Sequence, residues 1–415
     1  MQRSYRQITA KRNITGNDFD KGVIDFDFSI GGKTVFIPSR SYFRVGLELT
    51  KANGDPIEKA DDVAFANLAP GNLFDNVYFL AGGQTVSSIV NYAPQAHVCS
   101  YRLSKSGAWL NSVGKDAYGF SPDFEYRQLE ASVNVAADNV IIPVPQDISQ
   151  QGKKYFMYKP PLGIMEHGKP LGSGDYRFQF NPNSNFKTAC VESRGGVLPA
   201  TYNLNVTSME LYICTELMDV SPTGTELLHL MEHQVQSKNL GGVGDRNFDF
   251  TIPPSTKAIS VFIQSGAAGV NTRVPPSLLS CHANGVGGAG FDAQNTIRSI
   301  QLTYANMTKP PTRWTSEFSA TVRKLQQRYL DTQIESSQAF SAGGCETLQQ
   351  WLEGGVLLHY SWIRDANDRS TQLQLQVDYA EAEADAQIFV VAHYTRSVEM
   401  QINQGYIASV NSLTV

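Results

Sequence analysis

The sequence predicts an all-β protein with mainly antiparallel sheets, divided into two domains. Its 415 residues exceed the roughly 250–300 residues that one hydrophobic core usually serves, so two domains of about 200 residues each are expected. Apolar and polar residues alternate with a period of two in most patterned segments, which is typical of strands with one buried face. Helical periodicity is scarce and does not alternate with the strands, which argues against a parallel α/β sheet.

The first half contains several segments with this strand pattern. Alternation predicts strands over residues 24–30, 43–49 and 204–213. Apolar residues on both sides of Gly82-Gly83 predict a β-hairpin, because a glycine pair suits a tight turn. The best helix candidate in this half lies within residues 92–110.

The second half repeats the pattern. Strands are predicted over residues 248–252, 300–304 and 372–379, and we expect the second of these to be stopped by Pro310-Pro311. The third is the clearest strand in the chain, because its apolar residues alternate strictly with Gln and Asp. The continuous apolar run over residues 388–391 is typical of a strand that is covered on both faces.

One helix and the domain boundary complete the second half. Apolar residues recur at helical spacing from about Ser316 to Leu330, and the predicted apolar face consists of Phe318, Val322, Leu325 and Tyr329. The strand pattern is interrupted at residues 219–224, which contain Pro222 and Gly224. We therefore expect an N-terminal arm over residues 1–20, a first domain over 21–218 and a second over 219–415.

Composition and charge limit the partners of the chain. Charged residues make up 18% of the sequence and the net charge is −5, so no overall basic field draws the protein onto nucleic acid. The first twelve residues are a local exception, because they contain no acid and four basic residues, Arg3, Arg6, Lys11 and Arg12. This stretch is either a frayed terminus with incidental charge or a short interior-facing arm that contacts genome or an inner membrane.

The cysteines and the apolar runs indicate where the chain is made. The cysteine count is odd, with five residues far apart in sequence: Cys99, Cys190, Cys214, Cys281 and Cys345. Such spacing argues against a disulfide framework and for assembly in a reducing compartment. The sequence shows no signal-peptide pattern and no run that approaches 18 apolar residues, so we expect neither secretion by a signal nor a membrane span.

Three motifs that suggest chemistry have plainer interpretations. Residues 285–290 match a dinucleotide fingerprint by letter, but no strand-then-helix context surrounds them, so a loop is expected. His229 and His233 have a spacing that binds zinc from one helix face, with Cys281-His282 as the only suggestion for further ligands, and we interpret them as linker or interface residues. The acidic run 381–385 is expected to be a solvated hairpin tip. We predict no catalytic, cofactor or metal site.

The order of the segments carries a resemblance to a known family over roughly residues 22–215 and 246–402. The first half contains V-I-D-F-D-F-S-I, R-V-G-L-E-L-T-K-A-N-G-D-P, F-A-N-L-A-P-G-N-L-F-D-N-V-Y-F-L-A-G-G-Q-T-V and Y-K-P-P-L-G-I-M-E-H-G-K-P-L-G-S-G-D-Y-R-F-Q-F. The second half contains I-R-S-I-Q-L-T-Y-A-N-M-T-K-P-P, Q-R-Y-L, W-L-E-G-G-V-L-L-H-Y-S-W-I, L-Q-L-Q-V-D-Y and F-V-V-A-H-Y. In this order the chain resembles the double jelly-roll major capsid proteins of polinton and adintovirus elements and virophages. It is more distantly similar to adenovirus hexon and the capsid proteins of tailless membrane-containing phages.

The resemblance implies a fold and a role. The fold would be two tandem eight-stranded antiparallel jelly-roll barrels, with short helices in the connecting loops. The role would be that of a structural protein without enzymatic activity or cofactor, which forms pseudo-hexagonal homotrimers that tile an icosahedral viral shell. The implied partners are further copies of the chain, neighbouring trimers, penton and minor capsid proteins, and genome or internal membrane through the N-terminal arm, with no small-molecule substrate. Its place would be the virion, after assembly in the host cytoplasm or nucleus.

Two other classes of function compete with this reading. A secreted β-sandwich enzyme acting on polysaccharide would need a groove with two facing carboxylates, and the odd cysteines and missing signal argue against it. A viral spike or sugar-binding β-sandwich attachment protein would need an exposed aromatic platform.

Overall fold

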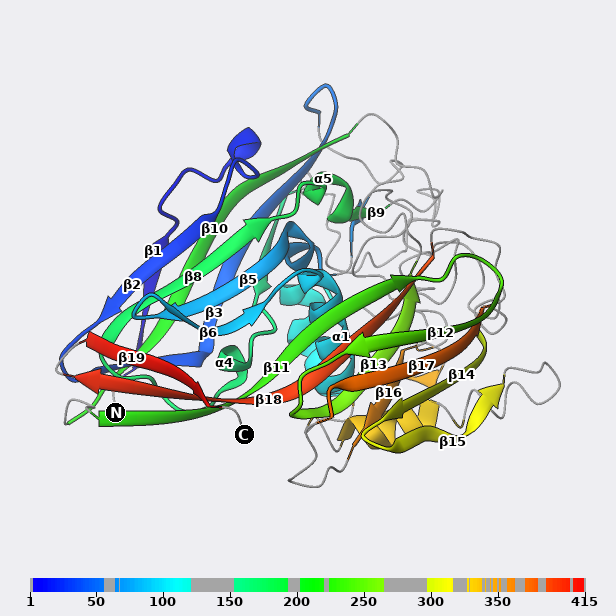
Figure 1. Cartoon of the computed structure of the whole chain (residues 1–415). Coiled ribbons are helices and arrows are strands. Elements are labelled where there is room, and N and C mark those ends of the chain that lie inside the picture. Colours follow the sequence, from blue (N-terminus) through cyan, green and yellow to red (C-terminus); the bar gives the residue numbers. More distant parts are fainter. Residues whose placement is uncertain are drawn as a thin grey trace.

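The computed structural model shows two β-barrels side by side (Figure 1). It describes residues 3–55, 64–66, 68–120, 153–192, 202–219, 224–264, 297–315, 327, 329–337, 340, 344, 346–348, 351, 357–362, 370–379, 386–403 and 406–413.

The first barrel consists of two four-stranded antiparallel sheets. Its strands are β1 (Arg3–Thr9), β2 (Ile24–Ile30), β3 (Thr34–Lys51), β5 (Phe74–Ala81), β6 (Gln84–Ile89), β7 (Lys153–Tyr158), β8 (Gly174–Pro182) and β10 (Tyr202–Leu217). One sheet has the order β1-β10-β3-β7 and the other has the order β2-β8-β5-β6. The short strands β4 (Ala64–Phe65) and β9 (Val191–Glu192) pair beside them.

The second barrel repeats this arrangement. Its strands are β11 (Gly224–Asn239), β12 (Gly244–Thr251), β13 (Thr256–Gln264), β14 (Ile297–Tyr304), β15 (Met307–Thr315), β16 (Leu358–Ser361), β17 (Gln372–Tyr379) and β18 (Gln387–Asn403). The sheets have the orders β11-β18-β13-β16 and β12-β17-β14-β15, and a last strand, β19 (Tyr406–Leu413), pairs with β18.

The two barrels share one topology. When the eight strands of each barrel are counted along the chain, one sheet has the order first, eighth, third, sixth, and the other has the order second, seventh, fourth, fifth. Two antiparallel four-stranded sheets connected in this way form a jelly roll. The predicted fold, two tandem eight-stranded jelly rolls, is therefore confirmed.

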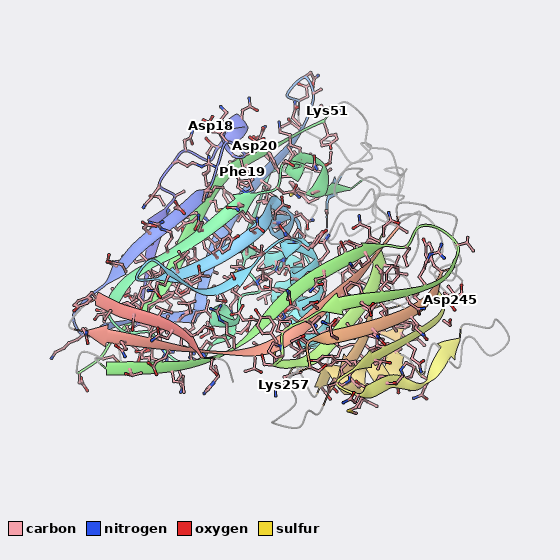
Figure 2. All side chains as sticks on the ribbon, viewed as in Figure 1. Asp18, Phe19, Asp20, Lys51, Asp245 and Lys257 are labelled. Atoms are coloured by element: carbon pink, nitrogen blue, oxygen red, sulfur yellow. The ribbon has the colours of Figure 1, made fainter. Side chains whose placement is uncertain are left out.

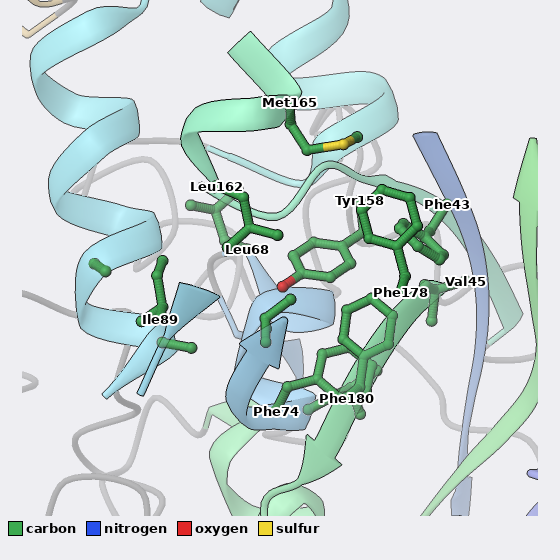
Figure 3. Packing of buried hydrophobic residues seen from close by; sticks show 14 of the residues in the cluster. Phe43, Val45, Leu68, Phe74, Ile89, Tyr158, Leu162, Met165, Phe178 and Phe180 are labelled. Atoms are coloured by element: carbon green, nitrogen blue, oxygen red, sulfur yellow. The ribbon is translucent and has the colours of Figure 1, made fainter. Parts of the chain in front are cut away.

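Aromatic side chains from facing sheets fill the first barrel. The ring of Phe43 on β3 meets Phe178 and Phe180 of β8 edge to face, with centroids 5.3 and 5.0 Å apart. Phe74 and Tyr158 surround these rings (Figure 3). Such pairs contribute about 0.5–1.5 kcal/mol each beyond the burial of their area, so the facing sheets are held in one arrangement.

Apolar and polar residues alternate strictly along β17, so that one face of this strand contributes to the core of the second barrel. On β17, Leu373, Leu375 and Val377 are buried, whereas the glutamines between them are exposed. The predicted strand over residues 372–379 has these same bounds, and the run over residues 388–391 is buried at every position. Side chains fill the space between the sheets of both barrels (Figure 2).

Short helices occupy the connections. They are η1 (Gly16–Asp18), η2 (Ala69–Leu73), α1 (Ala93–Ser104), α2 (Gly107–Trp109), η3 (Leu110–Tyr118), α4 (Gly163–Glu166) and α5 (Phe186–Ala189). The helix predicted within residues 92–110 is confirmed by α1. Of the helix predicted from Ser316 to Leu330, most residues lie outside the described ones, and residues 329–337 are helical. No helix in the described ranges is both long enough and apolar enough to cross a membrane.

The expected N-terminal arm is part of the first barrel. β1 pairs with β10 along its whole length, from Arg3 opposite Glu216 to Thr9 opposite Glu210. The first strand of the jelly roll therefore lies within residues 1–20. The alternation pattern missed it because the side chains of residues 3–7 are all exposed, so backbone hydrogen bonds hold this edge strand in place.

A second correction concerns the prolines of the second half. β14 ends at Tyr304 as predicted, but Pro310-Pro311 do not end it. Ala305 and Asn306 make the turn, with φ of 52° and 59°, and both prolines lie inside β15. β15 is an edge strand, where a residue without an N–H is tolerated.

Candidate functional site at the seam between the barrels

A set of buried polar contacts lies where the two barrels meet. We call this region the seam: on the first-barrel side β6, β8, α1 and α4, and on the second-barrel side the sheet β11-β18-β13-β16 with β19. In Figure 1, β18 continues from the second barrel along the first, where β19 joins it. The helices α1 and α4 and the strand β6 all contact β11, and β19 contacts β6 and β8.

Aromatic rings form the apolar part of the seam. Phe262 of β13 and Phe389 of β18 stack with their planes 3° apart and their centroids 5.2 Å apart. Tyr92, just before α1, meets the Phe389 ring edge to face at 5.3 Å. Its hydroxyl accepts a 2.9 Å hydrogen bond from Ser237 of β11, so the start of α1 is fixed to the second barrel.

Polar side chains of α1 continue the contact. Gln95 donates a hydrogen bond of 3.3 Å to Gln264 of β13. About two turns further along the helix, Arg102 forms an ion pair of 2.6 Å with Glu346, and both side chains are almost fully buried. Burial raises the pKa of Glu346, although the Arg102 guanidinium lowers it in part.

The strand β6 and helix α4 hold the neighbouring part of β11. The Ser87 hydroxyl of β6 donates a 2.6 Å hydrogen bond to Glu232 of β11. Complete burial raises the pKa of Glu232 to about 7, even though the hydrogen bond lowers it. A glycine is needed at position 163, because a Cβ there would lie 2.6 Å from the backbone oxygen of Met231.

The last strand closes the seam on the far side. Ile407 of β19 lies against two glycines of the first barrel, Gly82 in the β5–β6 turn and Gly174 at the start of β8. A Cβ at Gly174 would be 2.5 Å from Ile407 Cγ1, and one at Gly82 would be 3.0 Å from Ile407 Cβ. The C-terminal strand therefore fits onto the first barrel through a side chain that needs both glycines.

Three histidines form a connected group on the outer face of the second barrel's sheet. His233 and His393 are cross-strand neighbours, and their Nδ1 atoms are 2.9 Å apart. His393 Nε2 lies 2.7 Å from Ser260 Oγ, which lies 2.8 Å from His359 Nδ1. The residues next to Ser260, His359 and His393 belong to the core of the second barrel, so these side chains point out of that barrel and into the seam.

The group is sealed from water. The Phe340 ring lies over it, with its centroid 5.1 Å from the His393 ring and 5.8 Å from the His359 ring. Burial lowers the pKa of His233 to about 4 and that of His359 to about 3. The pKa of His393 is well below 6.5 because of burial and because of the two neighbouring imidazoles.

The sequence drew attention to His233 through its spacing from His229, whereas in the structure His233 contacts His393. His229 and His233 lie on a strand, where a spacing of four residues separates side chains by about 13 Å, too far for one metal ion. His229 instead pairs with Ser397 at 2.9 Å. No group of potential metal ligands occurs among the residues that the structure describes, while residues 285–290, Cys281-His282 and the acidic run 381–385 lie outside them.

The predicted basic residues all have partners within the chain. The Arg12 guanidinium donates to the carbonyl oxygens of five residues in the β1–β2 connection: Asn13, Asp18, Phe19, Gly22 and Val23. Arg3 pairs with Glu216 at 2.8 Å, Arg6 donates to the Ser29 carbonyl, and Lys11 forms an ion pair with Asp27. Figure 2 shows Asp18 at the outer end of the loop that Arg12 closes, whereas the Phe19 side chain is buried in the core of the first barrel. Arg12 thus stabilises a loop, and the interior-facing role of the four residues stays a prediction.

An aromatic stripe crosses the outer face of the first barrel. The Arg44 guanidinium lies 5.1 Å from the Tyr155 ring and 5.6 Å from the Tyr212 ring. Tyr212 stacks on Tyr42 at 5.3 Å, and Tyr5 of the edge strand lies 6.3 Å from Tyr42. Tyr5 and Tyr155 are more than half exposed. Tyrosine and arginine are the residue types enriched in protein interfaces.

A cavity of about 440 Å³ lies near the N-terminal strand. The residues that line it include Ser4, Arg6, Ser29, Thr34, Glu216 and Leu217. Its polar groups are largely engaged with one another, since Arg6 donates to the Ser29 carbonyl and Glu216 pairs with Arg3. The cavity has no nucleophile paired with a base and no facing carboxylate pair, so its lining does not resemble an active site.

The fold is similar to those of several solved viral structures. The Sputnik virophage structure matches at a TM-score of 0.59 with 11% identity, over 99% of this chain and 88% of that chain. The mavirus major capsid protein matches at 0.56 with 12% identity, over 99% and 90%. The PBCV-1 virus capsid matches at 0.53 with 10% identity, over 99% and 97%. No protein-family model and no curated protein matches the sequence. At such identities, the likeness establishes the double jelly-roll fold over nearly the whole chain.

Proposed function

We propose that this chain, with its two jelly rolls of one topology in a single polypeptide, is the major capsid protein of an icosahedral DNA virus or virus-like element. The observation that carries the proposal is the repeated strand order, together with the buried seam that fixes one barrel against the other. The structures it resembles come from viral capsids, and the likeness covers 99% of the chain.

The geometry fits a shell made of one repeated unit. Three chains contribute six barrels of similar shape, which form a pseudo-hexagonal homotrimer, and such trimers tile a flat facet by side contacts. The seam serves this arrangement because two loosely connected barrels would not present a constant outline. The function is assembly without turnover.

The partners and the place follow from this role. The chain packs against copies of itself within the trimer and against neighbouring trimers, and it meets penton and minor capsid proteins at the vertices and joints of the shell. Arg3, Arg6, Lys11 and Arg12 mark the side toward genome or internal membrane. The protein resides in the virion after assembly in the host cytoplasm or nucleus.

Light scattering and negative-stain imaging of the purified protein test the proposal. We expect a particle of about three times the chain mass of 45.6 kDa with a pseudo-hexagonal outline. A stable monomer at micromolar concentration would overturn the proposal.

The aromatic stripe favours one alternative, a sugar-binding attachment protein. Tyr5 and Tyr155 are exposed, and the flat apolar face of a tyrosine ring suits a sugar ring as well as a protein surface. Glycan-array binding that disappears in the Tyr155→Ala variant, in a protein that stays monomeric, would support that alternative. Trimers without glycan binding would support the capsid role.

A further inference from the structure

We propose that His233, His393 and His359, connected through Ser260, form an acid-sensitive lock on the seam, and that their protonation releases α1 from the second barrel. The inference concerns contacts within one chain and goes beyond the capsid role, because it assigns a regulatory device to the junction of the barrels.

The hydrogen-bond pattern of the group suits neutral rings. Each short contact, His233–His393, His393–Ser260 and Ser260–His359, holds one proton between two heavy atoms. Three neutral rings satisfy all three contacts when His359 donates to Ser260, Ser260 to His393 and His393 to His233, and equally when the three bonds run in the opposite direction. With two rings protonated, at least one contact would place a donor against a donor or leave Ser260 without an acceptor.

The surroundings offer no counter-charge in contact with the rings. The charged or titratable groups around them are Cys99 and Arg102 of α1, Glu346 paired with Arg102, Glu166 of α4, Glu232 next to His233 in sequence, and Lys309 of β15. No carboxylate among the described residues forms a hydrogen bond or ion pair with any of the three imidazoles. Lys309 acts against a charge on His359, and Glu232 is neutral at acid pH because burial raises its pKa to about 7. Glu166 favours a charge on His233, but its side chain is largely exposed, and water screens it.

The position of the three histidines determines that the contact between the two barrels opens before either barrel unfolds. Ser260 and the histidines lie on the face of the second barrel that is turned toward the seam, where Cys99 of α1 interacts with Ser260 and the Phe340 ring lies over His359 and His393. Charging the rings therefore weakens the contact between the barrels first, because water reaches the rings when α1 moves away. Each barrel keeps its own core, since Leu358 and Ala392 remain packed on the opposite face of the same strands.

The direction of the pH dependence follows from the burial. The folded-state pKa values lie below the ordinary 6.5, so the opened state binds more protons than the closed one between pH 6.5 and about 4. The contribution of the histidines to the stability of the closed seam is therefore fully present above pH 6.5 and is lost as the pH falls, whereas the single carboxyl of Glu232 has the opposite dependence between pH 4.5 and about 7. Each histidine that gains a proton on opening raises the opening constant about tenfold per pH unit in this window.

Hydrogen-exchange mass spectrometry on the full-length purified protein tests the lock. We expect the opening constant of the α1 amides, corrected for the pH dependence of intrinsic exchange, to rise at least tenfold per pH unit below pH 6. The His359→Gln variant should bind about one proton fewer on opening, which lowers the rise of the opening constant by about tenfold per pH unit. The matched control is His229→Gln on the same sheet, outside the group, which should leave the slope unchanged.

A second measurement needs no variant. Exchange of the imidazole C2 protons in the unaltered protein reports the pKa of each histidine, and we expect His233, His359 and His393 to have pKa values below the ordinary 6.5. The proposal is overturned if α1 is equally protected at pH 7 and pH 5, or if the slope is the same in His359→Gln. Light scattering on the same samples keeps the two proposals apart, because a monomer with an acid-sensitive α1 would contradict only the capsid role.

Discussion

Ser87 of the first barrel donates a 2.6 Å hydrogen bond to Glu232 of the second, and both side chains are fully buried. A carboxyl group in this position favours its protonated form, because the seam offers little solvation for the charge. Burial raises the pKa of Glu232 from 4.5 to about 7. The contact between the barrels therefore depends on pH through this carboxyl as well as through the histidines.

Glu232→Gln should stabilise the protein at alkaline pH. The folded state holds its proton more tightly than the unfolded state, so the wild type loses stability as the pH rises from 4.5 to about 7, and the loss is complete above that. The neutral amide removes this loss and keeps an acceptor for Ser87. We expect a gain on the order of 2 kcal/mol at pH 8 and little change at pH 4.5 in urea unfolding. Glu399→Gln, a less buried site on β18, is the control, and an equal gain there or none in Glu232→Gln would contradict the prediction.

The contact of Ile407 with Gly174 predicts a pair of compensating variants. Gly174→Ala places a methyl group 2.5 Å from Ile407 Cγ1, and such overpacking costs about 1–3 kcal/mol. Ile407→Ala removes the obstructing atoms, so the double variant should recover part of the stability that Gly174→Ala loses. Thermal unfolding of the four proteins gives the coupling. Additive effects would show that β19 does not pack on the first barrel, and Gly168→Ala, where a Cβ meets nothing within 4 Å, is the control.

Much of the fold was predictable because the decisive residues are local. The strand over residues 372–379 was predicted with its bounds, since Leu373, Leu375 and Val377 face one core and the glutamines face water. The Gly82-Gly83 hairpin was predictable for a similar reason, because both glycines have positive φ, as the turn requires. Local patterns fail where side chains do not decide the structure, as in β1, whose exposed residues pair with β10 through the backbone.

The seam was not predictable in the same way. His233, Ser260, His359 and His393 come together only after the register of four strands is fixed, and no spacing in the sequence encodes that register. The available signal was indirect: His359 and His393 each lie inside an apolar strand, where an uncharged imidazole needs a partner. That signal predicts burial of the rings without identifying their neighbours.

Arg12→Lys should destabilise the first barrel although it preserves the charge. A lysine has three donors on one atom and cannot reach the five carbonyl oxygens that the guanidinium contacts. We expect a loss of about 1–2 kcal/mol in urea unfolding. Arg6→Lys, which affects a single exposed hydrogen bond to Ser29, should be nearly neutral. Equal effects of the two substitutions would argue that Arg12 does not hold the loop.

The same geometry changes how the role of the basic residues toward genome or membrane must be tested. Deleting residues 1–12 removes β1 and leaves one edge of β10 unpaired, with β3 still on its other side, so we expect the truncated protein to be unstable or insoluble. Charge-removing substitutions of exposed Arg3 and Arg6 keep the strand and isolate the effect of charge on cargo or membrane retention. A truncated protein as stable as the full chain would contradict the assignment of β1 as a required strand.

The buried pair Arg102–Glu346 should couple the two barrels strongly. Arg102→Met leaves the Glu346 carboxyl buried without its cation, and removing one partner of such a pair costs about 3–5 kcal/mol. The double variant Arg102→Met, Glu346→Leu should recover most of that loss, because an apolar pair of similar volume needs no solvation. Urea unfolding of both proteins, with exchange at α1 as a local readout, measures the effect. A double variant as unstable as Arg102→Met alone would indicate that the guanidinium acts through contacts other than Glu346.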